Sequence, residues 1–176
     1  KADDALAEIE RLKKELSESK SEAEQLRLTK AYNKETDALS ATDWFQKGYN
    51  AGINEEYDKS ISFFLRAIEI DPDDAIAYYN LGLAYYDQGN TAKAIELWEK
   101  AIEIDPDYAK AYYNMGNAYY DQGNYTKAIE LYEKAIELKP DFAAAYLNLG
   151  VAYHKSDFDT ALIYYKKAAR LGHKGV

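Results

Sequence analysis

The sequence predicts an all-α fold, a solenoid of about four helix-turn-helix repeats preceded by a long N-terminal helix. The main observation is a near copy, because the stretch 77–107 recurs at 111–141, an offset of 34 residues. A fixed period of this length is the signature of a repeat array. Four glycines keep that spacing, and so do all three prolines of the chain: Gly48, Gly82, Gly116 and Gly150, and Pro72, Pro106 and Pro140.

Within one period, the apolar spacing indicates two helices. Tyr78, Leu81 and Tyr85 lie at i, i+3 and i+7, so they share one helical face. A glycine then breaks the helix, and a second apolar stripe follows over 94–102. Pro106 marks the end of the second helix, since the residue before a proline is disfavoured in the helical conformation. Each repeat is therefore expected to form a helical hairpin.

Small and bulky residues alternate in two sets that match position by position. The small ones leave room where two helix axes approach closely, and the aromatic ones fill the space between. The sets are Tyr78, Leu81, Gly82, Tyr85, Ala94, Trp98, Ala101 and Pro106, and Tyr112, Met115, Gly116, Tyr119, Ala128, Tyr132, Ala135 and Pro140. This combination resembles the tetratricopeptide repeat family. The resemblance implies a right-handed α-solenoid whose concave inner face binds peptides.

We divide the chain into an N-terminal region, 1–40, and a repeat domain, 41–176. The repeats are expected at 41–74, 75–108, 109–142 and 143–176. The first is degenerate. Lys47 stands where the later repeats have leucine or methionine, so we expect it to be less enclosed than its equivalents. We also expect the upstream helix not to stack there as a preceding repeat would.

The fourth repeat is one residue shorter and lacks the turn glycine. No further helix follows it in the sequence, although solenoid ends normally carry a polar cap. Tyr164 and Tyr165 are therefore expected to be partly uncovered, or covered by a neighbouring molecule. Since the chain begins at Lys1, we expect a fragment or a processed product. The near-ideal middle repeats are compatible with partial design, whereas the irregular outer repeats favour a natural origin.

The N-terminal region predicts a long amphipathic helix with a coiled-coil-like seam over residues 5–26. Apolar or small residues alternate there at spacings of four and three, which is a heptad pattern. The seam residues are Ala5, Ile9, Leu12, Leu16, Ser19, Ala23 and Leu26. Two interpretations stay open, namely self-association into a homo-oligomer and folding back onto the repeats. Ser40 and Thr42 are the two candidate N-caps for the first repeat helix.

Composition limits the classes of partner. The net charge of −9 argues against nucleic acid or an anionic membrane as the main partner, because both need a basic surface. The chain has no cysteine, hence no disulfide and no thiolate metal site. It also has no apolar run long enough to predict a membrane span. The compartment is left undetermined.

The sequence offers no catalytic constellation. There are two histidines, His154 and His173, and they lack the spacing of a paired metal site. Nucleophile-elbow and phosphate-loop motifs are missing from the sequence. We therefore expect no enzymatic activity, no cofactor and no metal.

The resemblance assigns partner binding to the second face of each first helix. Apolar members of this set favour an apolar or amphipathic partner segment, including a helical one. One family subclass grips acidic C-terminal tails through a lysine, arginine and asparagine clamp, but here only Lys110 and the asparagines partly match it. The full set is Phe45, Gln46, Tyr49, Tyr79, Asn80, Leu83, Tyr86, Lys110, Tyr113, Asn114, Asn117, Tyr120, Leu147, Asn148, Val151 and His154.

The predicted function is thus a non-enzymatic protein-interaction module or scaffold that binds a peptide or helix in its concave groove. The asparagine amides are expected to hold the partner's backbone, and the tyrosines to supply apolar area with a polar tip. An alternative is a structural platform that assembles through the N-terminal helix and the exposed C-terminal end. A face that is merely solvated is the third interpretation of the same residues.

Overall fold

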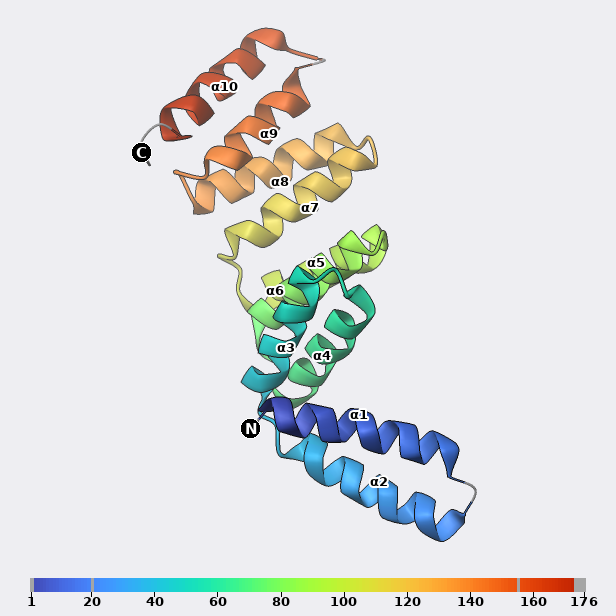
Figure 1. The fold of residues 1–176 in the computed structure, drawn as a ribbon. Coiled ribbons are helices and arrows are strands. Elements are labelled where there is room, and N and C mark those ends of the chain that lie inside the picture. Colours follow the sequence, from blue (N-terminus) through green and yellow to red (C-terminus); the bar gives the residue numbers. More distant parts are fainter. Residues whose placement is uncertain (1, 20, 155, 173–176) are drawn as a thin grey trace. The chain divides into compact units, whose positions relative to one another are not determined.

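The computed structural model describes residues 2–19, 21–154 and 156–172 (Figure 1). Within these residues the chain forms ten helices and no strand, which confirms the all-α prediction. The chain divides into two compact units, one ending at Pro72 and one beginning at Asp73. Each unit is described by itself. None of the helices in the described ranges is long and apolar enough to cross a membrane.

The first unit holds two hairpins. Helix α1 (Ala2–Glu18) packs on α2 (Glu22–Asp37), and α3 (Ala41–Ile53) packs on α4 (Tyr57–Ile70) (Figure 1). The predicted N-terminal helix is therefore formed only in part, because this region is helical but divided into two shorter helices. The chain leaves the helical conformation around Ser19 and Ser21, where Ser19 Oγ donates to the Ser21 carbonyl oxygen at 3.3 Å. Serine side chains compete for backbone groups in this way and favour turns over helix interiors.

The break divides the predicted heptad seam. Ile9 is 1% exposed and packs with Leu39, Trp44 and Ala67 in the core of the first unit, whereas Leu26 on α2 is 58% exposed. Leu12 is buried too, Ala5, Leu16 and Ser19 are half-buried, and the side chain of Ala23 lies outside the described residues. The first part of the seam thus folds back onto the chain's own first repeat. A continuous seam on one helix is not formed.

Helix α3 begins with a capping box, as the sequence predicted for Ser40. Ser40 Oγ accepts a hydrogen bond from the Asp43 backbone N–H at 3.2 Å, and the Asp43 carboxylate accepts one from the Ser40 N–H at 3.0 Å. The hydrogen bonds from Ser40 lower the pKa of Asp43. This cap fixes where the first repeat starts.

Helix α1 lies over the first repeat at Lys47. The Lys47 ammonium group pairs with the Asp3 carboxylate, and the Lys47 side chain remains 18% exposed. Leu81 and Leu149, its equivalents, are almost fully buried. Lys47 is thus less enclosed, as predicted, and α1 reaches this site without stacking on α3 as α6 stacks on α7 or α8 on α9. Packing there is loose, because a pocket of about 350 Å³ includes Leu6 and Lys47 in its lining.

The second unit is a stack of three hairpins (Figure 1). Each hairpin packs its two helices together, and successive hairpins contact through α6 with α7 and α8 with α9. This arrangement confirms the repeat solenoid. The helices are α5 (Ala75–Asp87), α6 (Thr91–Ile104), α7 (Ala109–Asp121), α8 (Tyr125–Leu138), α9 (Ala143–Tyr153) and α10 (Phe158–Gly172).

The periodic glycines allow the two helices of a hairpin to approach closely. A Cβ atom added at Gly116 would lie 2.5 Å from Cε1 of the buried Tyr132 ring, and one at Gly150 would lie 2.7 Å from the Tyr165 ring. Real Cβ atoms do not approach other atoms so closely, since interiors are already close-packed. A side chain at either position would push the second helix away from the first.

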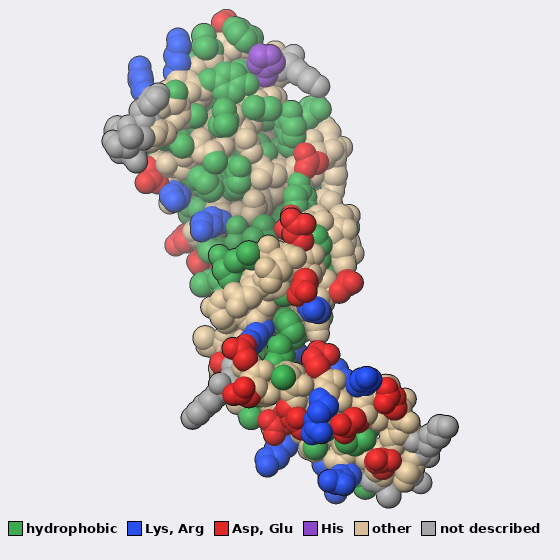
Figure 2. Space-filling model, in the orientation of Figure 1, with side chains coloured by type: hydrophobic (Ala, Val, Ile, Leu, Met, Phe, Trp, Pro, Cys, Tyr) green, Lys and Arg blue, Asp and Glu red, His purple; other side chains and the backbone are tan. Residues whose placement is uncertain are grey.

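Polar and apolar surfaces are distributed differently in the two units. Figure 2 shows Lys, Arg, Asp and Glu crowded over α1 and α2, whereas apolar side chains gather over α7 to α10. Several apolar side chains of the second unit are exposed, among them Leu147 and Val151 on α9 and Phe158 and Ile163 on α10. On the face drawn, charged side chains thus concentrate on the first hairpin and apolar ones on the second unit.

Candidate functional site

The first helices of the three hairpins in the second unit, α5, α7 and α9, carry most of the predicted partner-binding residues. We call this surface the α5–α7–α9 face and define it by Tyr79, Tyr86, Asn114, Asn117, Leu147, Asn148 and Val151. Its asparagines make side-chain hydrogen bonds from helix to helix.

A ladder of asparagine–tyrosine hydrogen bonds connects the three helices. Asn114 Nδ2 donates to the Tyr79 hydroxyl at 2.9 Å, and Asn148 Nδ2 donates to the Tyr113 hydroxyl at 3.1 Å. Both pairs join the first helix of one repeat to the first helix of the next, at equivalent positions. From the sequence, these amides are expected to hydrogen-bond a partner's backbone. In the structure they hold neighbouring repeats together.

The ladder tyrosines are also packed against other aromatic rings. The edge of the Tyr79 ring meets Tyr108 with ring centroids 5.0 Å apart, and Tyr113 lies 4.9 Å from Phe142. Trp98 Nε1 donates to the Tyr79 carbonyl oxygen at 3.1 Å. Burial raises the pKa of Tyr79. These tyrosines are therefore half-buried parts of the repeat interface.

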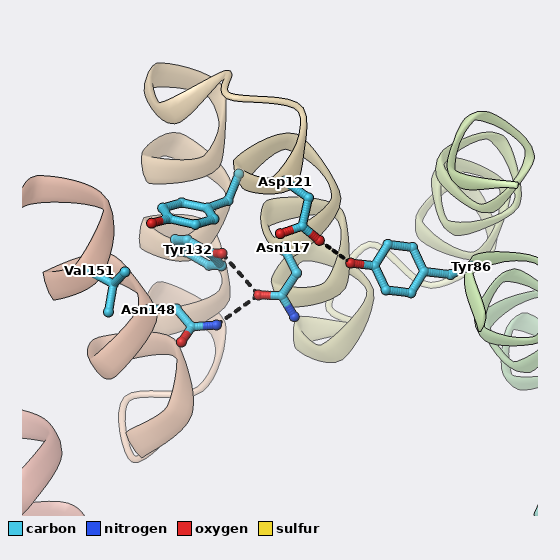
Figure 3. A pocket seen from close by; sticks show the side chains of 7 residues that line it. Tyr86, Asn117, Asp121, Tyr132, Asn148 and Val151 are labelled. Carbon is cyan, nitrogen blue, oxygen red and sulfur yellow. Dashed lines mark hydrogen bonds between the residues drawn. The ribbon is translucent and has the colours of Figure 1, made fainter. Parts of the chain in front are cut away.

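A pocket of about 250 Å³ opens between the four helices α5, α7, α8 and α9 (Figure 3). Asn117 Oδ1 accepts two hydrogen bonds there, one from the Tyr132 hydroxyl at 2.9 Å and one from Asn148 Nδ2 at 2.8 Å. The Tyr86 hydroxyl donates to the Asp121 carboxylate. The lining residues are Tyr86, Asn117, Tyr120, Asp121, Tyr132, Asn148 and Val151.

The phenols of Tyr86 and Tyr132 stay protonated at neutral pH. Burial, followed by the hydrogen bond to Asp121 and its negative charge, raises the pKa of Tyr86 to about 12. Burial likewise raises the pKa of Tyr132 well above its ordinary value. Both hydroxyl hydrogens are thus present and directed at acceptors within the protein.

Two lining residues, Asp121 and Tyr132, were not among the predicted site residues. Tyr132 lies on a second helix, and the sequence analysis took candidates from first helices alone. Asp121 is the last residue of α7, at the end of the predicted face. The repeat period could have identified Asp121, because Asp87 holds the equivalent position one repeat earlier.

The remaining predicted residues of the second unit are placed as follows. Leu147 and Val151 are exposed, at 49% and 37%, and Leu83 is half-buried against the core. Asn80 Nδ2 donates to the Ile76 carbonyl oxygen of its own helix at 2.8 Å. The Tyr120 ring lies 5.1 Å from Tyr125, the His154 ring lies 5.4 Å from Phe158, and Lys110 is exposed near the start of α7.

The predicted residues of the first repeat lie in the other compact unit. Phe45 packs edge-on against Phe64 with centroids 5.4 Å apart. Gln46 Nε2 donates to Asn50 Oδ1 at 3.0 Å, and Tyr49 is exposed on the same helix.

Comparison with protein-family models decides the family. The TPR repeat model matches residues 53–89, 83–123 and 116–157, which together span more than half of the chain. The chain belongs to the TPR repeat family. A Sel1 repeat model also matches residues 143–173. A search of curated proteins found no match.

Solved structures support the same fold. A crystal structure of MamA protein is 30% identical, with a TM-score of 0.72, and the match covers 98% of this chain and 92% of that one. A mutant Thermobaculum terrenum O-GlcNAc transferase is 29% identical with a TM-score of 0.68, but the match covers 26% of that chain. The first TPR of Spaghetti (RPAP3), bound to the HSP90 peptide SRMEEVD, is 24% identical with a TM-score of 0.63 over 66% of this chain and 92% of that one. At that identity, the likeness shows the fold alone.

Proposed function

We propose that the α5–α7–α9 face binds a segment of a partner protein and that this TPR repeat protein acts as a non-enzymatic interaction module. One observation carries the proposal. Leu147 and Val151 are exposed on α9, while the asparagines and tyrosines around them are hydrogen-bonded to one another. A partner would therefore gain apolar contact without displacing water from unsatisfied polar groups, and the face would need little reordering on binding.

The partner segment is expected to be amphipathic. Its apolar side would contact Leu147 and Val151, and its polar side would meet the hydroxyl and amide groups of the pocket. The Spaghetti (RPAP3) domain, whose solved structure contains a peptide, supports peptide binding as a use of this fold. An acidic peptide is not the expected partner here, because the pocket presents Asp121 and a set of tyrosines and asparagines.

The test is a peptide selection on the intact protein, followed by calorimetry. Replacing both Leu147 and Val151 with serine removes exposed apolar contact and should weaken selected peptides at least tenfold, which corresponds to about 1.4 kcal/mol. The matched control is Ile163→Ser on α10, where the side chain is 65% exposed but lies outside the face. Failure to select any peptide, or equal weakening by the control, would contradict the proposal.

Self-assembly remains a second candidate, favoured by the apolar surface of α10. Phe158 and Ile163 are both largely exposed there, on the last described helix. The N-terminal helix contributes less, because Ile9 and Leu12 are buried within the first unit. Sedimentation of Ile163→Asp and Leu26→Asp variants separates the two surfaces. If the parent protein itself sediments as a monomer, neither surface drives self-assembly.

A further inference from the structure

Most hydrogen-bond donors in the pocket between α5, α7, α8 and α9 already donate to acceptors within the protein. The two hydroxyl hydrogens of Tyr86 and Tyr132 go to Asp121 and Asn117. Both amide hydrogens of Asn148 are used as well, one on Tyr113 and one on Asn117. Asn117 Oδ1, with two hydrogen bonds, is saturated as an acceptor.

The groups of the pocket that can still bind a ligand are mainly hydrogen-bond acceptors. A carboxylate has about four acceptor sites, and Tyr86 occupies one of those on Asp121. Figure 3 shows the second Asp121 oxygen turned away from Tyr86. The hydroxyl oxygen of Tyr86 also keeps a lone pair, since it donates its hydrogen to Asp121. A group rich in N–H donors would complement this set.

The charge of the pocket also favours a ligand of this kind, namely a cation. Asp121 is the one charged residue in the lining made by the described chain, which includes no lysine or arginine. Asp87, at the equivalent position one repeat earlier, adds to the negative potential at Tyr86, and the chain carries a net charge of −9. An anion would be repelled, whereas a cation would be attracted even before it made contact.

The walls of the pocket favour a flat cation. Tyr86 and Tyr120 supply two half-buried aromatic rings beside a volume of about 250 Å³, while the Tyr132 ring is almost fully buried. Guanidinium groups stack on aromatic faces and present five donors in one plane, whereas an ammonium group is a compact, strongly hydrated point charge. The arginine side chain therefore matches both the rings and the spread of acceptors over several helices.

We propose that this pocket receives an arginine side chain of the bound partner segment, with Asp121 as its counter-ion. The inference rests on the proposed function and names the polar determinant of the partner. It places the apolar contacts at Leu147 and Val151 and the charged contact at Asp121, on adjoining parts of one face.

The experiment uses peptides selected on the intact protein and resynthesised with each arginine replaced by citrulline or lysine. Citrulline keeps the shape and removes the charge. The parent protein should bind the arginine peptide at least tenfold more tightly than the citrulline peptide, and more tightly than the lysine peptide. Asp121→Asn should abolish this difference, because asparagine still accepts the Tyr86 hydrogen bond but carries no charge. Glu99→Gln, an exposed change on α6, is the matched control and should leave it intact.

The outcomes separate this inference from the proposed function. Peptides that lose affinity with the Leu147 and Val151 serine variant, yet bind equally as arginine or citrulline forms, would overturn the arginine assignment and leave the function standing. Equal binding of lysine and arginine forms would also overturn it. Failure to select any peptide would overturn both.

Discussion

The first and third repeats form the same hairpin from different residues. In α3 and α4, Gly48 faces the Phe64 ring, and in α7 and α8, Gly116 faces the Tyr132 ring. Around this shared contact the two repeats diverge, because Lys47 replaces Met115 and Ser60 replaces Ala128. The shared contact fixes the hairpin, and the divergent positions depend on what covers them.

Helices α7 and α3 are packed against different kinds of neighbour. Helix α7 is covered by the preceding repeat, in which the buried Trp98 packs in one cluster with Met115. Helix α3 is covered by α1, through buried Ile9 and the ion pair between Asp3 and Lys47. A hairpin without the repeat pattern can therefore cover part of a repeat helix through one well-buried side chain, without stacking on it as a repeat does.

The largest expected effect comes from removing that side chain. Ile9→Ala should lower the free energy of unfolding of the first unit by about 3 kcal/mol, because it leaves a cavity beside Trp44. Urea denaturation followed by tryptophan fluorescence measures it. Leu26→Ala, on the same predicted seam but exposed, should change stability by less than about 0.5 kcal/mol. Equal losses would mean that α1 does not serve as the cover.

The glycine–aromatic contact is the next test. Gly116→Ala should lower stability by about 2 kcal/mol, because the new methyl group meets a buried ring, which outweighs the better helix propensity of alanine. Gly52→Ala is the control in the first repeat, where the added Cβ atom would lie 3.3 Å from Ser60 Oγ. Its stability should stay within about 1 kcal/mol of the parent protein. A tolerated Gly116→Ala would show that the contact does not fix the hairpin.

Ser60 tests a polar adaptation of the first repeat. Its fully buried Oγ donates to the Gly48 carbonyl oxygen at 2.8 Å. Ser60→Ala installs the residue of the later repeats, yet it should lower stability by about 1 kcal/mol because a buried hydrogen bond is lost. Chemical denaturation of Ser62→Ala, an exposed change on the same helix, provides the baseline. A gain in stability on Ser60→Ala would contradict the assignment.

The smallest effect is expected at the turn. Gly89 and Gly123 have φ angles of 91° and 77°, and Glu55 holds the equivalent place with φ 60°. A residue with a Cβ atom is strained in this left-handed conformation. Glu55→Gly should therefore raise stability by about 0.5 kcal/mol, whereas Gly123→Ala should lower it by about 1 kcal/mol. Thermal denaturation of both variants measures the difference, and changes of the same sign would refute the strain argument.

The period made the second unit predictable, since each repeat serves as a check on the next. The N-terminal break was not predictable in the same way, because neither proline nor glycine marks it and the serines around Ser19 are weak signals. Lys47 was correctly expected to be less enclosed, but its partner Asp3 lies 44 residues away in the sequence. A pair of residues so far apart in the sequence cannot be recognised from a periodic pattern.

The site was predictable as a set of positions but not as a network. Helical spacing places Asn114 and Asn148 on the same face as Tyr79 and Tyr113, yet the direction of each amide depends on the distance between repeats. Asn148 bonds to both Tyr113 and Asn117, and the sequence contains no sign of that choice. The pocket was missed for a related reason, because four helices contribute to it.

The asparagine–tyrosine rungs make the array extensible. Each rung joins residues one period apart and uses only groups that every full repeat supplies. Duplicating residues 109–142 within the chain would therefore add one more rung of the same kind and lengthen the surface by one unit. Such a protein would work as a molecular ruler, with contact points at a constant interval that is set by the helices and not by the ligand.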